Sequence, residues 1–124
     1  MAWDVAADNY WIKNLQPGWD NNHAQAIGED TFVRMCFVVK KITFQVEETI
    51  IHVIDPIAHP SIGPVSDGSI DVLWNYRRRN LLMNFPHETS RLPEFYGQVD
   101  GSLSFLKGTL IMGEEEMLVL WLLR

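Results

Sequence analysis

Three consecutive arginines, Arg77 to Arg79, are the residues whose type and spacing most directly suggest binding chemistry. Guanidinium groups donate paired hydrogen bonds to phosphate or carboxylate, and Trp74 and Tyr76 precede the cluster closely enough for exposed rings to stack on bases. The favoured alternative is that both aromatic residues belong to a core face and leave only a solvated hairpin tip. As a binding site, the cluster favours a protein partner with an acidic patch over RNA.

Trp19 and Asp20 form the second candidate. As a binding site, Asp20 and His23 would supply polar groups in a surface loop. The structural interpretation is favoured, in which Trp19 fills the core and Asp20 accepts hydrogen bonds from backbone N–H groups of the following turn. We therefore expect this segment to have a structural role and not a binding role.

Motifs for catalysis or metal binding are absent from the sequence. The four histidines form no H-x-x-x-H or H-x-H pair, and the single cysteine, Cys36, joins none of them. No nucleophile elbow, P-loop or G-x-G-x-x-G segment occurs. The sequence predicts no metal and no cofactor, and it favours a protein without enzymatic activity over an enzyme; a small enzyme with a site assembled near His23 or His52 is the distant alternative.

Length and charge restrict the class of protein further. The 124 residues predict a single domain over 1–124, with 47% hydrophobic residues and a net charge of −6. Only the segment 77–91 is basic, with four arginines against one acid, so no general nucleic-acid-binding surface is expected. No apolar run is long enough to span a membrane, no secretory signal is visible, and a lone cysteine favours the cytoplasm.

Hydrophobic periodicity predicts an α+β fold with helices at both ends of the chain. The expected helices cover 4–15, 29–44 and 114–124. Alternating residues predict four strands, at 70–76, 81–85, 95–99 and 103–107. Residues 46–62 are expected to form a short strand or an extended connector. The resulting architecture is a four-stranded antiparallel meander packed against N-terminal helices and a C-terminal helix.

Two segments carry a family resemblance: Leu15 to Asp20 (LQPGWD), and Pro64 to Trp74 (PVSDGSIDVLW). Their order resembles small bacterial and phage-type proteins with a "GWDG-x-GA" segment, a helix, and then "P-x-x-DG-x-I-x-L-x-W" in an antiparallel sheet. The resemblance implies an architecture and no chemistry. Asn21 and His23 stand where the family usually has glycines, and Ala26 where it often has proline; Asn21 tolerates a positive φ.

The leading functional hypothesis is a non-catalytic macromolecular interaction protein, of the kind found among antitoxins, immunity proteins and phage inhibitors. The alternative is an RNA- or nucleotide-binding module that uses the Arg77–Arg79 hairpin tip. The segment Met117 to Leu123 has almost no polar face. We therefore expect the C-terminal helix to contribute to a homodimer or partner interface.

Overall fold

The N-terminal segment forms two short helices where the sequence predicted one. The computed structural model describes residues 4–49 and 59–124, and it shows α1 (Val5–Asp8) and α2 (Tyr10–Lys13). The carboxylate of Asp4 caps α1 by accepting hydrogen bonds from the N–H groups of Ala6 and Ala7, both at 3.1 Å. Asn9 separates the two helices, and its side-chain amide donates to the carbonyl of Val5 at 3.0 Å.

The long helix α3 (Glu29–Thr49) extends five residues beyond the predicted end at residue 44. Val46, which is 2% exposed, continues the buried stripe by one turn, and this explains the extension. The expectation of a strand or connector over 46–62 is therefore wrong at its start, because residues 46–49 are helical. Residues 50–58 lie outside the described part of the chain, and residues 61 and 62 begin β1 (Ser61–Pro64). Pro64 is tolerated because β1 is an edge strand.

The sheet has five antiparallel strands in sequence order. The prediction of four strands was wrong, because it did not include the edge strand β1. The other four predicted strands all form: β2 (Ile70–Tyr76), β3 (Arg79–Phe85), β4 (Glu94–Val99) and β5 (Phe105–Thr109). The last strand begins two residues later than predicted, because the turn after Val99 continues through Ser102, whose N–H donates to the Val99 carbonyl at 3.1 Å. Leu103 is consequently 99% exposed.

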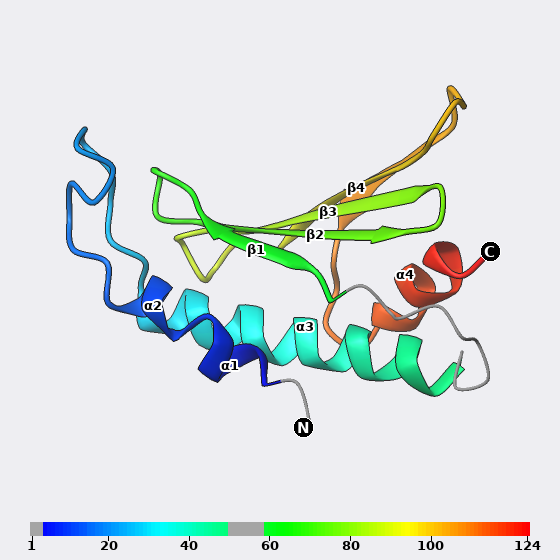
Figure 1. Ribbon diagram of the computed structural model, residues 1–124, viewed down its shortest axis with the longest axis horizontal. Coiled ribbons are helices and arrows are strands. Elements are labelled where there is room, and N and C mark those ends of the chain that lie inside the picture. The colour runs from blue at the N-terminus through cyan, green and yellow to red at the C-terminus, as the bar shows by residue number, and fades with distance from the viewer. Residues whose placement is uncertain (1–3, 50–58) are drawn as a thin grey trace.

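One face of the sheet packs against the helices and forms the core. Figure 1 shows α3 running beneath the sheet and α4 (Glu115–Leu122) beside its C-terminal half. The predicted core face of β2 is confirmed, since its four inward residues are all buried: Ile70, Val72, Trp74 and Tyr76. No helix in the described ranges is long and apolar enough to cross a membrane.

The C-terminal helix is buried along one side only. Leu118, Val119 and Leu122 contribute to the core, whereas Met117 and Leu120 are 47% and 58% exposed. Lys41 of α3 forms an ion pair with Glu115, the first residue of α4, at 3.1 Å. The two helices are therefore joined by apolar packing and by one charged contact.

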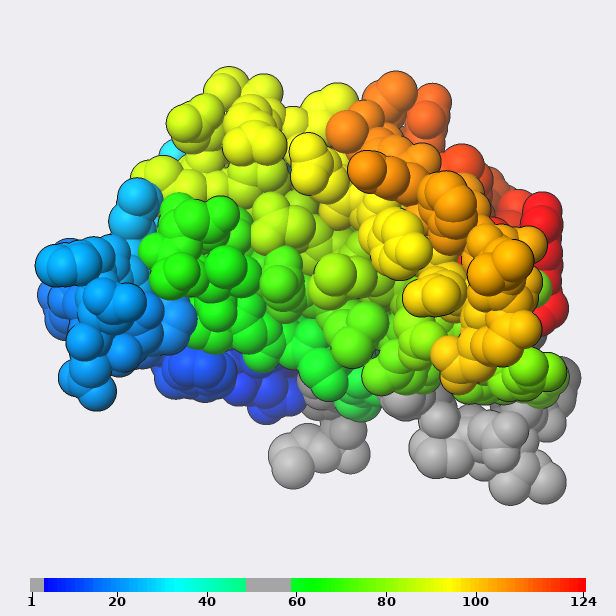
Figure 2. Space-filling model, turned by 90° about the horizontal axis from the view of Figure 1, so that it is seen from above, coloured from blue at the N-terminus to red at the C-terminus, as the bar shows by residue number. Residues whose placement is uncertain are grey.

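No described helix covers the opposite face of the sheet. Figure 1 shows this face turned away from α1 to α4, and Figure 2 looks directly onto it. Strand register places the outward side chains in three rows across β2 to β5. The rows are Asp71, Asn84, Glu94 and Thr109; Leu73, Leu82, Tyr96 and Lys107; and Asn75, Asn80, Gln98 and Phe105.

Candidate functional site

The centre of the open sheet face is apolar and exposed. Leu82, Tyr96 and Phe105 are 39%, 42% and 64% exposed, respectively. The rings of Tyr96 and Phe105 stack at 5.9 Å between centroids and 19° between planes. Because the two rings on neighbouring strands hold each other in place, the shape of this surface is set before any partner protein binds.

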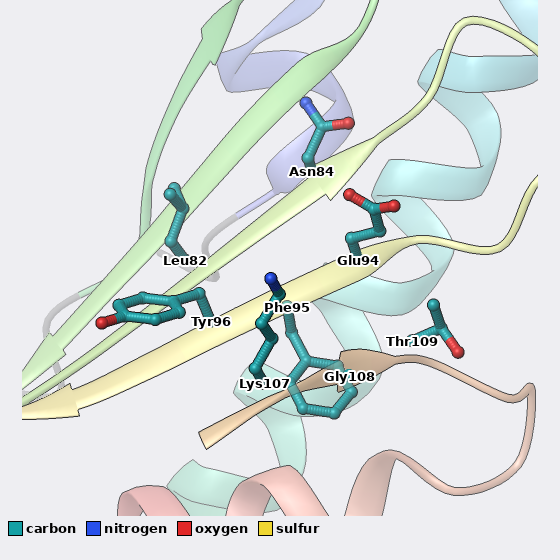
Figure 3. A pocket seen from close by; sticks show the side chains of 8 residues that line it. All are labelled: Leu82, Asn84, Glu94, Phe95, Tyr96, Lys107, Gly108 and Thr109. Atoms are coloured by element: carbon teal, nitrogen blue, oxygen red, sulfur yellow. The ribbon is translucent and has the colours of Figure 1, made fainter. Parts of the chain in front are cut away.

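A hollow of about 350 Å³ opens beside these residues, over β3 to β5. Figure 3 shows the side chains around it, with Leu82 and Tyr96 on one side and Asn84 and Glu94 on another. Gly108 pairs with the core residue Phe95 across β4 and β5, and a Cβ atom at this position would lie 2.8 Å from the Phe95 ring. The hollow thus combines an apolar wall with polar groups, as binding sites commonly do.

Polar side chains gather where the open face meets the turn before β2. Asn84 donates hydrogen bonds to Ser69 Oγ at 2.9 Å and to Asp71 Oδ1 at 2.8 Å, and Ser69 Oγ donates to Asp67. The hydrogen bond from the Ser69 hydroxyl has the largest effect on Asp67 and lowers its pKa, and the bond from the Ser69 backbone N–H lowers it further. Burial acts in the opposite direction but does not outweigh them. Ser69 is 1% exposed and fully engaged, so this network orders the turn and offers no nucleophile.

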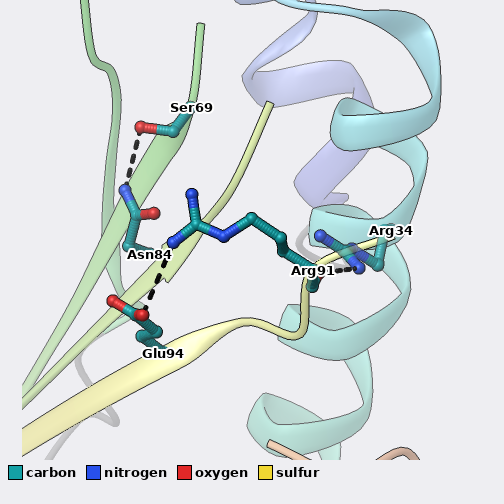
Figure 4. Close-up of polar contacts among 5 residues, drawn as sticks. All are labelled: Arg34, Ser69, Asn84, Arg91 and Glu94. Carbon is teal, nitrogen blue, oxygen red and sulfur yellow. Dashed lines mark hydrogen bonds and ion pairs between the residues drawn. The ribbon is translucent and has the colours of Figure 1, made fainter. Parts of the chain in front are cut away.

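The loop 86–93 completes a second, polar hollow of about 440 Å³ at this end of the face. Arg34 of α3 fixes the loop by donating to the carbonyls of Thr89 and Arg91, at 3.1 and 2.8 Å. The side chain of Arg91 reaches back toward Glu94, at 3.6 Å, as Figure 4 shows. Burial lowers the pKa of Arg34, whose guanidinium anchors the loop from below.

Gln25, which lines this polar hollow, links the two segments that carried the family resemblance. The N–H of Gln25 donates to the carbonyl of Ser66 at 2.8 Å, and the indole Nε1 of Trp19 donates to the carbonyl of Gln25, also at 2.8 Å. His87 lies against Gly68, where a Cβ atom would be 2.7 Å from His87 Nδ1. The positive φ of 87° at Gly68 also requires glycine.

Trp19 does not fill the core, so that prediction was wrong. Its ring is half-buried and closes its own loop through the bond to Gln25. The structural role of Asp20 is confirmed, because its carboxylate accepts from the N–H groups of Asn22 at 2.9 Å and Ala24 at 3.2 Å. Asn21 has a φ of 61°, which an asparagine in place of glycine accommodates.

The three arginines do not form one cluster. Arg77 lies over the Tyr76 ring at 5.4 Å, Arg78 donates to the Asp100 carbonyl at 2.7 Å, and Arg79 lies over the Trp121 ring at 5.0 Å. Trp74 and Tyr76 are only 2% and 8% exposed. Neither ring therefore has a free face for base stacking, which removes the aromatic half of the predicted RNA site.

The histidines are also dispersed. His23 and His87 are exposed, His59 lies 3.4 Å from Glu47, and His52 falls outside the described residues. Within 4–49 and 59–124, no three His, Cys, Asp or Glu side chains are grouped so as to hold a metal ion. Burial raises the pKa of Cys36 to about 11, so its thiol stays protonated at neutral pH.

No protein-family model, curated protein or solved structure matches this chain. The resemblance to bacterial and phage-type proteins therefore stays a prediction. Sequence reasoning also missed Tyr96 and Phe105 as surface residues. The usable signal was Leu82, which alternates with the core residues of its strand and so had to face away from them.

Proposed function

We propose that this protein is a non-catalytic protein-binding module whose open sheet face receives a partner protein. The observation that supports this most strongly is the exposure of Leu82, Tyr96 and Phe105 on a sheet face that no described helix covers. Exposed aromatic and aliphatic groups at the centre of a face, with polar groups around them, are the usual anatomy of a protein interface. An antitoxin, immunity protein or phage inhibitor would act through such a surface.

The charges around the polar hollow indicate what the partner carries at that end. Asp67, Glu88 and Glu94 face Arg91 there, which gives a formal charge of −2 with His87 neutral. A lysine or arginine of the partner would complement this end, while an apolar side chain fills the hollow beside Leu82. The acidic patch predicted for the partner would face the arginines at the other end of the strands.

RNA is the less favoured ligand for the same face. Its outward rows carry Asp71 and Glu94 against a single lysine, Lys107. Binding to nucleic acid depends on neutralising phosphates with basic groups, and this face supplies too few of them. The stacked pair of Tyr96 and Phe105 alone does not compensate for that deficit.

Two matched double variants test the proposal. Leu82→Ser with Tyr96→Ser alters the open face, whereas Val33→Ser with Phe44→Ser alters exposed residues of α3 that are 56% and 58% exposed. A tagged full-length chain is used to recover its partner from native cells. We expect the first variant to lose the partner and the second to keep it.

Loss of the partner only in the α3 variant would contradict the proposal and transfer the interface to the helices. An interaction that ribonuclease abolishes and protease-treated extract retains would favour the RNA alternative instead. Unchanged thermal unfolding is the control for both variants, because all four side chains are at least one third exposed.

A further inference from the structure

Another hollow of about 340 Å³ lies where β3 begins and α4 ends, next to Phe105 of the open face. Its polar lining residues come from three separate parts of the chain: Arg79 of β3, Ser102 and Ser104 before β5, and Arg124 beyond α4. Ser102 Oγ accepts a hydrogen bond from the Ser104 N–H at 3.0 Å and keeps its own O–H to donate. Trp121 of α4 provides an aromatic wall. Donors that converge from distant segments of the sequence are a stronger indication of a site than a run of like charges on one strand.

Trp121 holds Arg79 in place. The indole lies against Gly97 of β4, where a Cβ atom would come within 2.6 Å of the ring. The guanidinium of Arg79 lies 5.0 Å from the centre of the same indole. This cation–π contact restricts the position of the Arg79 guanidinium, whose N–H groups lie in its own plane and can still donate hydrogen bonds.

The charge of this hollow is unbalanced. Arg79 and Arg124 both line it, and no acidic side chain does. Among residues 4–49 and 59–124, neither arginine forms an ion pair with an Asp or Glu. Two guanidiniums without an Asp or Glu partner in the described ranges therefore lie at one hollow, on a protein with a net charge of −6.

We propose that this hollow binds the phosphate group of a phosphate monoester. Two guanidinium forks and two serine hydroxyls offer more donors, from more directions, than the two oxygens of a planar carboxylate can accept. The three terminal oxygens of a phosphate monoester fit such a set. Phe105 lines this hollow and also belongs to the open face, so the two sites adjoin, but phosphate binding does not require the partner protein.

Titration of the isotopically labelled full chain with inorganic phosphate tests the site by NMR. Saturable shifts of the Trp121 indole N–H and of the Arg79 and Arg124 side chains are expected at millimolar phosphate, at constant ionic strength set with chloride. Arg79→Ala should weaken phosphate binding about tenfold or more, the usual effect of losing a charge-assisted hydrogen bond. Arg79→Lys should recover only part of this loss.

Arg77→Ala is the matched control, because it removes the same charge two residues away from a side chain that does not line the hollow. We expect this variant to bind phosphate almost as the wild type does. Equal losses in Arg77→Ala and Arg79→Ala would overturn the proposal, since general electrostatics would then explain the shifts. Shifts identical with chloride alone would overturn it as well, and would leave the arginines as counter-charges for the carboxyl end of α4.

Two further titrations use O-phosphoserine and a nucleoside monophosphate in place of inorganic phosphate. Tighter binding of one of them than of inorganic phosphate identifies whether an amino-acid or a nucleotide scaffold carries the phosphate. A wild-type protein that prefers acetate or succinate to all three phosphates would contradict the proposed ligand class.

Discussion

Lys41→Met should destabilise the protein by isolating a buried charge. The Glu115 side chain is 0% exposed, and its Oε2 atom lies 3.1 Å from Lys41 Nζ. The other oxygen accepts a long hydrogen bond from the Gly113 N–H, at 3.3 Å. Removing one partner of a buried pair costs about 3–5 kcal/mol. Because Lys41 is 39% exposed and partly screened, we expect a loss of about 2–3 kcal/mol in the free energy of unfolding.

Urea titrations of three variants separate this effect from simple loss of a surface lysine. Lys40→Met is the matched control, since Lys40 is the exposed neighbour, and it should change stability by no more than about 0.5 kcal/mol. The double variant Lys41→Met with Glu115→Gln should recover part of the loss, because no uncompensated charge remains. A Lys41→Met protein as stable as the wild type would refute the reasoning.

The pH dependence provides an independent check with a definite sign. Burial by itself raises the pKa of Glu115, but hydrogen bonds from its own backbone N–H, Lys41 and Gly113 outweigh burial and lower it. In the wild type this carboxylate therefore stabilises the fold above its unfolded pKa of about 4.3, and the contribution disappears as the pH falls further. Without Lys41, only the N–H groups of Glu115 and Gly113 oppose the effect of burial, so the pKa of Glu115 rises and stability should fall less steeply than in the wild type as the pH is lowered. An unchanged pH profile in Lys41→Met would contradict the assignment.

Three further perturbations test the framework around the site. Arg34→Met should remove two hydrogen bonds to the loop 86–93 and accelerate amide exchange there, at a cost of about 1–3 kcal/mol; unchanged exchange would mean that the loop is held by other contacts. Asn21→Val should cost about 1–2 kcal/mol, because its φ is 61°, whereas Asn21→Gly should be neutral or stabilising in thermal unfolding. Cys36, with a pKa of about 11, should react slowly with iodoacetamide at neutral pH and faster only when the protein unfolds; rapid alkylation of the native chain would contradict its burial.

Local patterns predicted much of the sheet. Strict alternation around Trp74 and Met83 identified the β2–β3 hairpin and its buried face, because a two-residue period has no competing helical explanation there. The edge strand β1 was missed as a definite strand because it has four residues and contains Pro64, and strand pairing, not local preference, holds it. The same limit applies to Val46, which extends α3 only because a core lies beneath it.

The candidate site was harder to predict from the sequence than the sheet was. Alternation placed Leu82 opposite the core residues of its strand, but whether the opposite face is covered depends on where the helices pack. Consecutive arginines suggested one cluster, yet each finds a different neighbour, and Arg79 reaches Trp121, 42 residues later in the sequence. Trp19 was expected to be in the core because large aromatic rings usually are. Its indole N–H instead satisfies a carbonyl of its own loop.

Site-specific photo-crosslinking in native cells tests the central claim most directly. A benzophenone amino acid replaces Tyr96 on the open face or, in the control protein, Val33 on α3. The proposed function predicts a discrete protein adduct from position 96, resistant to nuclease and abolished by an additional Leu82→Lys change, and no such adduct from position 33. An adduct from position 33 alone, or a crosslink at position 96 that nuclease removes, would contradict a protein-binding role for the open sheet face.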